Sequence, residues 1–201
     1  MSWKDEQHFE KNWHGNCVNS YWEETKQIVY AKRMGLKAEM IDGKYPVYDL
    51  KGISVLDIGG GAYSMLLKCI NFKGTVFDPC DYPKWIEERY KEAGIEYRRM
   101  KGEDLDQINL TFDVGLIYNV LQHVDNPEKI IKNARKICSE IRIFEWIDNG
   151  ISPGHPWDLK EEKLNKWLGG IGKIEQLNEQ GCKGKSYYGI FKGDTFKENR
   201  L

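Results

Sequence analysis

Short apolar runs alternate with amphipathic stretches along most of this chain. Short runs rich in β-branched residues predict buried strands, and apolar positions at i, i+3 and i+4 predict helices. We expect strands at residues 53–58, 74–77, 95–100, 112–118 and 139–147, and helices at 64–71, 83–93, 127–138 and 159–168. Residues 173–177 and 186–192 are expected to form a closing antiparallel pair. Because strands and helices alternate, the pattern predicts an α/β fold with a parallel sheet between helices.

The N-terminal quarter precedes this alternation and has a different pattern. Residues 2–13 and 20–33 are predicted helices, and Ser20 and Glu23 form a capping box at the start of the second. Gly35 suits its C-terminal end, and residues 36–51 are expected to be a mixed linker. We therefore expect a helical lid over residues 1–50 and an α/β domain over residues 51–201.

The composition excludes several classes of protein. Of the 201 residues, 40% are hydrophobic and 30% are charged, which suits one globular domain. The net charge of -1 disfavours nucleic acid and anionic membranes as partners. No apolar run approaches the ~20 residues needed to span a bilayer, and the polar N-terminus lacks the apolar centre of a signal peptide.

The cysteines predict a reducing compartment. All five are scattered and none forms a C-x-x-C pair: Cys17, Cys69, Cys80, Cys138 and Cys182. Neither a disulfide framework nor a metal site is expected from this spacing, and the cytoplasm is the expected location.

Residues 53–64, ISVLDIGGGAYS, combine a predicted strand, three glycines and the start of a predicted helix. Glycine permits positive φ and lets a ligand approach the backbone without a Cβ in the way. The start of a helix offers unpaired N–H groups. This combination predicts a site for a nucleotide-type ligand.

Two such ligands are compatible with the glycine loop. The dinucleotide pattern G-x-G-x-x-G would have Ser64 in place of its third glycine, and the charge of Asp57 would repel a pyrophosphate. S-adenosylmethionine (SAM) carries no phosphate, and an acidic side chain is compatible with its ammonium, its sulfonium and its ribose. Asp78, 21 positions after Asp57, suits a ribose in either ligand. The residues therefore favour SAM and leave NAD as an alternative.

Four motifs follow one another in order. They are VLDIGGG at residues 55–61, Asp78 after the second strand, Glu103 and Asp104 after the third, and FDVGLIYNVLQHV at residues 112–124. This series resembles the class I SAM-dependent methyltransferases over about residues 53–144. The resemblance implies a Rossmann-like, seven-stranded, mostly parallel sheet whose last strand is antiparallel. It also implies SAM as the cofactor and methyl transfer as the activity, in a domain spanning residues 51–201.

The resemblance implies roles for individual residues. Asp78 is expected to hold the ribose, Glu103 or Asp104 to face the adenine, and Asn119 and Gln122 to lie near the methionyl carboxylate and the methyl-transfer face. The full expected cofactor set is Asp57, Gly59, Gly60, Gly61, Asp78, Glu103, Asp104, Asn119 and Gln122.

Candidate catalytic residues follow from the chemistry of the acceptor. The sulfonium is already activated, so positioning contributes much of the rate, and a hydroxyl acceptor also needs a general base. His155 in a Pro/Gly-rich loop is the first candidate, and His14 in the lid and Glu145 on the fifth strand are the others. Surface or capping roles are the alternative for both histidines, and a solvated strand position for Glu145. His123 better suits a structural role.

The sequence thus predicts a cytoplasmic SAM-dependent methyltransferase acting on a small-molecule or sugar-like acceptor, at oxygen rather than nitrogen. Residues 118–121 read YNVL and not the Asn-Pro-Pro-Tyr pattern of many nucleic-acid amino methyltransferases. No metal triad is evident. A non-catalytic SAM-binding or partner protein and an NAD-dependent oxidoreductase are the alternatives. The sequence leaves the oligomeric state open.

Overall fold

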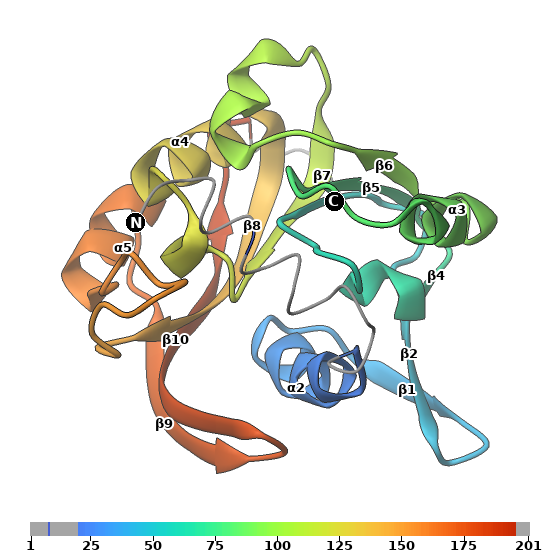
Figure 1. Ribbon diagram of the computed structural model, residues 1–201, viewed down its shortest axis with the longest axis horizontal. Helices are drawn as coiled ribbons and strands as arrows, with labels where there is room; N and C mark the ends of the chain where they lie inside the picture. Colours follow the sequence, from blue (N-terminus) through green and yellow to red (C-terminus); the bar gives the residue numbers. More distant parts are fainter. Residues whose placement is uncertain (1–7, 9–19, 196–201) are drawn as a thin grey trace.

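The computed structural model describes residue 8 and residues 20–195, and the centre of this part is a seven-stranded sheet (Figure 1). Its strands lie in the order β6-β5-β3-β7-β8-β10-β9. They are β3 (Ser54–Ile58), β5 (Lys73–Phe77), β6 (Glu96–Arg98), β7 (Phe112–Tyr118), β8 (Cys138–Ile147), β9 (Lys173–Glu179) and β10 (Cys182–Lys192). The five strands from β6 to β8 pair in parallel, and β10 is antiparallel to both β8 and β9. The predicted sheet is confirmed.

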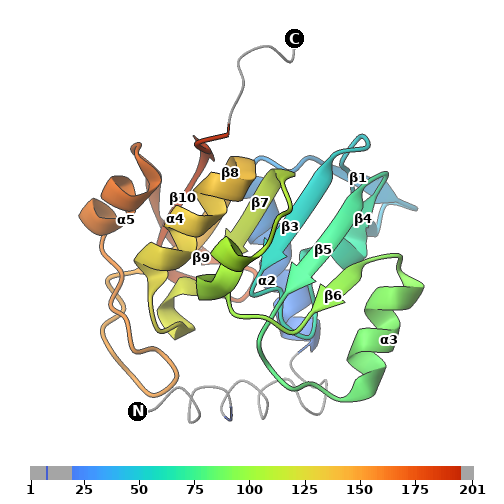
Figure 2. The same ribbon diagram turned by 90° about the horizontal axis from the view of Figure 1, so that it is seen from above.

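Helices cover both faces of this sheet (Figure 2). One face carries α4 (Pro127–Ile137), α5 (Glu161–Leu168) and the 3-10 turns η2 (Gly102–Gln107) and η3 (Leu121–His123). The other carries α2 (Ser20–Arg33), α3 (Lys84–Glu92) and the 3-10 turn η1 (Met65–Lys68). The central strands β3 and β7 are buried between two apolar clusters, which explains why apolar side chains point to both of their faces.

Alternation along the strands decides which cluster each side chain joins. Val55 of β3 packs in the cluster on the α2 face, whereas its neighbour Leu56 packs in the cluster on the α4 face. Asp57 therefore points to the α2 face, together with Tyr118 of β7. This placement determines how the glycine loop is held.

Helix α4 begins with a side-chain cap and a proline. The side chain of Asn126 accepts a hydrogen bond from the Lys129 N–H at 2.9 Å, and Pro127 occupies the first turn, where its missing N–H costs nothing.

The prediction of a helix at residues 64–71 is wrong. The chain forms only η1 there and then the short strand β4 (Cys69–Ile70). The first N–H groups of η1 bind side chains, and Cys69 is extended at φ -100° and ψ 151°. Pairing of β4 with β2 (Tyr45–Asp49) stabilises the extended conformation in place of further helical turns.

The linker expected at residues 36–51 is a hairpin. Strand β1 (Ala38–Ile41) pairs antiparallel with β2, which joins β4 in a small three-stranded sheet of the described chain. Asp42 and Gly43 at the turn have φ of 52° and 65°. An Asp-Gly pair in this conformation is a strong hairpin signal, and this signal could have been read from the sequence.

Helix α2 packs directly on the sheet. Val29, Tyr30 and Met34 are buried in the cluster on its face, and Arg33 forms ion pairs with Glu175 at 2.9 Å and with Glu179 at 2.5 Å on β9. The predicted helix at residues 2–13 and most of the rest of the expected lid before α2 lie outside the described residues, so the division at residue 50 stays a prediction. No helix in the described part of the chain has the length and apolar character to cross a membrane.

Candidate active site

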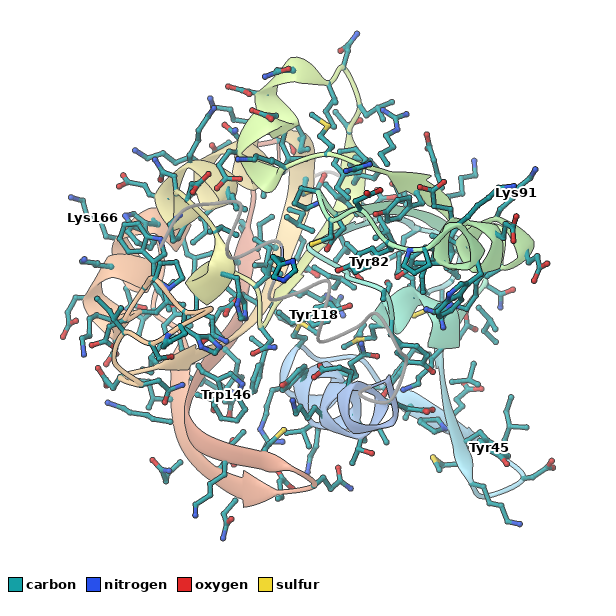
Figure 3. The ribbon with its side chains drawn as sticks, viewed as in Figure 1. Tyr45, Tyr82, Lys91, Tyr118, Trp146 and Lys166 are labelled. Atoms are coloured by element: carbon teal, nitrogen blue, oxygen red, sulfur yellow. The ribbon has the colours of Figure 1, made fainter. Side chains whose placement is uncertain are left out.

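A cavity of about 480 Å³ lies at the carboxyl ends of β3, β5, β7 and β8. Ligands of open α/β sheets bind at this edge. Tyr82, Tyr118 and Trp146, which follow or end three of these strands, mark its walls in Figure 3. Other lining residues come from the expected cofactor and catalytic sets: Gly59, Gly60, Gly61, Asp78, Asn119, Gln122 and His155.

The glycine loop needs its glycines. Gly59 has a φ of 73° and Gly61 a φ of 65°, a region that favours glycine. A Cβ on Gly59 would overlap the Val120 side chain, and a Cβ on Gly60 would lie 2.8 Å from the Asp57 carboxylate. The loop therefore fits closely between two neighbours while its backbone lines the cavity.

Asp57 is buried beneath this loop and does not line the cavity. Its Oδ2 accepts hydrogen bonds from the Ser64 hydroxyl at 2.5 Å and from the Tyr118 hydroxyl at 2.6 Å. Burial raises the pKa of Asp57 to about 7. The carboxyl thus joins the end of β3 to β7 and to the start of η1.

Four backbone N–H groups in and after the loop donate hydrogen bonds to side chains of the protein. The N–H of Gly61 donates to Asp78 at 2.9 Å, and that of Ser64 to the Tyr90 hydroxyl at 2.8 Å. The next two donate to the Tyr118 hydroxyl and to Ser64 Oγ. A pyrophosphate would need such N–H groups as its donors. The arrangement therefore disfavours a dinucleotide.

Asp78 directly follows β5 and reaches the cavity. Its Oδ2 accepts from Gly61 N–H and its Oδ1 from Cys80 N–H, both at 2.9 Å. Burial raises the pKa of Asp78. Each carboxylate oxygen can accept a further hydrogen bond, which is the chemistry that a ribose diol needs.

The loop after β7 carries the other two expected cofactor residues that line the cavity. Asn119 adopts a left-handed φ of 53°, a conformation that asparagine tolerates better than most residues. Its Oδ1 accepts a hydrogen bond from Gln122 Nε2 at 3.0 Å. The two amides are thereby held together at the cavity wall.

Two histidines lie side by side in the cavity wall, with ring centroids 4.6 Å apart. His123 Nδ1 donates to the Gly154 carbonyl at 2.6 Å, and burial lowers the pKa of His123 to about 4. His155 Nδ1 lies 3.1 Å from Ser152 Oγ, and burial and His123 lower the pKa of His155. Both rings are therefore neutral at neutral pH, the state in which an imidazole can accept a proton.

Comparison with known proteins agrees with this geometry. A family model described as a methyltransferase domain matches residues 56–140. The chain has the fold of the class I SAM-dependent methyltransferases. This match and the observed sheet agree with the predicted resemblance.

Relatives of known structure include methyltransferases for different acceptor atoms. The 1,6-didemethyltoxoflavin-N1-methyltransferase of Burkholderia thailandensis, with bound S-adenosylhomocysteine, has a TM-score of 0.55 and 15% identity over 71% of this chain and 72% of its own. The mitomycin 7-O-methyltransferase MmcR has a TM-score of 0.57 and 15% identity over 96% of this chain and 61% of its own, so this chain spans about three fifths of it. These likenesses establish the fold, and the acceptor does not follow from them.

A relative by sequence is an uncharacterized protein of Methanocaldococcus jannaschii. It is 28% identical over 179 residues, which cover 85% of this chain and 80% of that protein.

The remaining expected residues that the structure describes lie away from the cavity. Glu103 Oε1 accepts the Asn126 N–H at 3.0 Å, next to the start of α4. Asp104 borders a neighbouring depression that Pro79 and Lys101 also line. Glu145 is buried and binds backbone N–H groups, and His14 lies outside the described residues. The adenine role of Glu103 or Asp104 and the catalytic role of His14 stay predictions.

Several cavity residues carry no sequence signal. Gln27 of α2 lines the cavity and donates to the Tyr63 carbonyl at 2.6 Å, and Trp146 and Lys183 come from β8 and β10. These positions belong to elements that meet only in the folded chain. Tyr90 and Tyr118, whose hydroxyls hold the glycine loop, were likewise indistinguishable from core aromatics in the sequence.

We expect Gly59→Ala to destabilise the protein more than Gly94→Ala. Both glycines have similar positive φ, 73° and 70°, so alanine brings a similar backbone strain of roughly 1–2 kcal/mol. Only at Gly59 does the new Cβ meet a side chain, that of Val120; nothing lies within 4 Å at Gly94. Urea unfolding should show an additional loss of about 1 kcal/mol or more at Gly59. Equal losses would contradict the close fit of the loop.

We expect Asp57→Asn to flatten the dependence of stability on pH. The pKa of Asp57 rises from its ordinary 3.8 to about 7 on folding, so the folded protein holds a proton that the unfolded chain releases. The stabilisation is therefore complete below about pH 4 and lost as the pH rises through about 7. Between about pH 5 and 8, the free energy of unfolding of the wild type should fall by roughly 2 kcal/mol more than that of the variant. Identical slopes in denaturant titrations would rule out this account of Asp57.

Proposed function

We propose that this protein is a SAM-dependent methyltransferase acting at oxygen on a small-molecule or sugar-like acceptor in the cytoplasm. The observation that carries the proposal is a single cavity lined by the glycine loop, by Asp78, by the Asn119–Gln122 amide pair and by His155. Cofactor-binding groups and a proton acceptor thus face one space.

The cofactor half fits SAM on chemical grounds. Its acceptor groups include the Asp78 carboxylate and the Asn119 side chain. The N–H groups after the loop bind protein side chains. SAM brings hydroxyl and ammonium donors and a sulfonium, and it has no phosphate that would need those N–H groups. Asp78 would hold the ribose diol, and the bare backbone of Gly59 to Gly61 leaves room for the methionine moiety.

The acceptor half suits a hydroxyl group. Bound SAM supplies an electrophilic methyl on its sulfonium. His155, neutral and beside Ser152, would accept the hydroxyl proton as the oxygen attacks, and the hydrogen bond at Nδ1 would set the ring's orientation. His123 would support that ring from the side, because its Nδ1 is already committed to the Gly154 carbonyl. An amine acceptor would need only to be neutral, so the imidazole favours oxygen.

The cytoplasmic location rests on the cysteines. Cys69, Cys138 and Cys182 are buried thiols, and burial raises the pKa of each, which keeps them protonated and unreactive. Buried thiols of this kind suit a reducing compartment. Cys17 lies outside the described residues.

Asp78→Ala should weaken SAM binding about tenfold or more, because the ribose loses its acceptor and the glycine loop loses a hydrogen bond. Calorimetric titration with SAM, S-adenosylhomocysteine and NAD measures this directly. Asp81→Ala is the matched control, since Asp81 lies three positions after Asp78 and is an exposed carboxylate that pairs with Arg99. Wild-type binding of NAD alone would favour the oxidoreductase, and unchanged SAM affinity in a folded Asp78→Ala protein would remove Asp78 from the site.

His155→Ala should lower the rate of methyl transfer by a factor on the order of 100 and leave SAM affinity unchanged. Mass spectrometry of an acceptor panel detects the product through its added methylene mass. Ser152→Ala keeps the ring and removes its hydrogen-bond partner, so a smaller loss of rate is expected. Full activity without His155 would exclude it as the base. Tight SAM binding with no product from any acceptor would instead favour the non-catalytic protein.

A further inference from the structure

Glu145 of β8 is buried on the opposite face of the sheet from Asp57. Its neighbours Phe144 and Trp146 pack with the cluster on the α2 face, whereas Ile143 and Ile147 pack with the cluster on the α4 face. Since side chains alternate along a strand, Glu145 points to the α4 face, beneath η3. Its side chain is 0% exposed and does not line the cavity.

A single oxygen of this carboxyl holds the start of η3. Oε1 accepts hydrogen bonds from Val120 N–H at 3.0 Å and from Leu121 N–H at 3.1 Å. Val120 is the residue before η3, and its apolar side chain cannot cap the turn itself. Glu145 thus performs from a neighbouring strand the task that a capping side chain performs locally.

The segment held in this way contributes to both halves of the cavity. Asn119 and Gln122 line the half that we assign to the cofactor, and His123 lines the half that holds His155. Val120 also packs where a Cβ on Gly59 would lie. The backbone at Asn119 is in the left-handed region and would relax to a more common conformation if the next N–H groups lost their acceptor.

We propose that Glu145 is the positioning residue for the segment 119–123, and that it acts on cofactor binding through this segment without touching the cofactor. The inference rests on the function proposed above for this cavity.

The chemistry of the side chain supports this role. A buried carboxyl is costly unless hydrogen-bonded, and the other oxygen, Oε2, has no hydrogen-bond partner among the described residues. Burial raises the pKa of Glu145 to about 8. A leucine of similar size would avoid this cost but would leave the N–H groups of Val120 and Leu121 without this acceptor. The feature specific to Glu145 is therefore its acceptor oxygen.

Three variants of the full-length chain separate the acceptor from other effects. Glu145→Leu removes the acceptor, Glu145→Gln keeps an acceptor oxygen without the charge, and Glu140→Gln is the matched control. Glu140 lies on the same strand, pairs with Arg142 at 2.6 Å and does not line the cavity. For each variant, calorimetry measures the Kd for SAM, and amide hydrogen exchange measures protection at residues 119–123 and in β3.

We expect Glu145→Leu to weaken SAM binding about tenfold or more and to lose exchange protection at Val120 and Leu121, while β3 stays protected. Glu145→Gln should bind within about threefold of the wild type and keep that protection, and Glu140→Gln should match the wild type. Rescue by glutamine together with local loss of protection is not expected from a residue that only stabilises the core.

Two results would overturn the proposal. One is wild-type affinity and protection in Glu145→Leu, and the other is a Glu145→Gln protein as impaired as Glu145→Leu. If the leucine variant does not fold, Glu145→Asp replaces it, because the shortened side chain should lose contact with the two N–H groups; unchanged protection and affinity would then contradict the proposal. If the wild type binds no SAM, the proposed function fails, and the exchange data still decide whether Glu145 holds the segment.

Discussion

The hydrogen bonds made by the buried carboxyl of Asp57 are the interactions on which the site depends. Three successive glycines have no side chains to hold themselves in place, and the loop they form must stay open on its cavity side. Asp57 binds Ser64 and Tyr118 below the loop, and the hydroxyls of Tyr118 and Tyr90 bind the N–H groups that follow it. These hydrogen bonds support the loop from beneath, and its backbone lines the cavity on the other side.

A second buried carboxyl, Glu145, has the same relation to the next loop. Asp57 lies on the α2 face and Glu145 on the α4 face, and both lie near the carboxyl edge of the sheet. Each accepts two hydrogen bonds, from Ser64 and Tyr118 in one case and from two backbone N–H groups in the other. Burial raises the pKa of both carboxyl groups. Each loop is therefore held by a carboxyl group whose surroundings favour its neutral, protonated form. The cavity lies between the two supported loops.

The sequence predicted the elements whose signal is local. Strand β7 begins and ends where its apolar run does, and α4 begins at the Asn126-Pro127 pair that caps it. The helix predicted at residues 64–71 is wrong, because its apolar stretch is only locally typical of a helix. Tertiary hydrogen bonds and the pairing of β4 with β2 limit the helical part to η1. The Asp42-Gly43 pair is a local hairpin signal within residues 36–51, where a hairpin replaces the expected linker. Among the expected site residues, the glycine loop, Asp78, Asn119, Gln122 and His155 line the cavity, whereas Asp57, Glu103, Asp104 and Glu145 do not.

By itself, the sequence determined the succession of the main-sheet strands along the chain, the glycine loop and the acid after the second of these strands, because each depends on residues close together in the chain. Only the tertiary structure decided which carboxyl faces the cavity and which supports a loop. A strand turns alternate side chains to opposite faces, but which face is covered, and by which neighbour, depends on segments distant in sequence. The pairing of His123 with His155 and the approach of Gln27 from α2 arise in the same way, because packing brings together residues whose spacing carries no pattern.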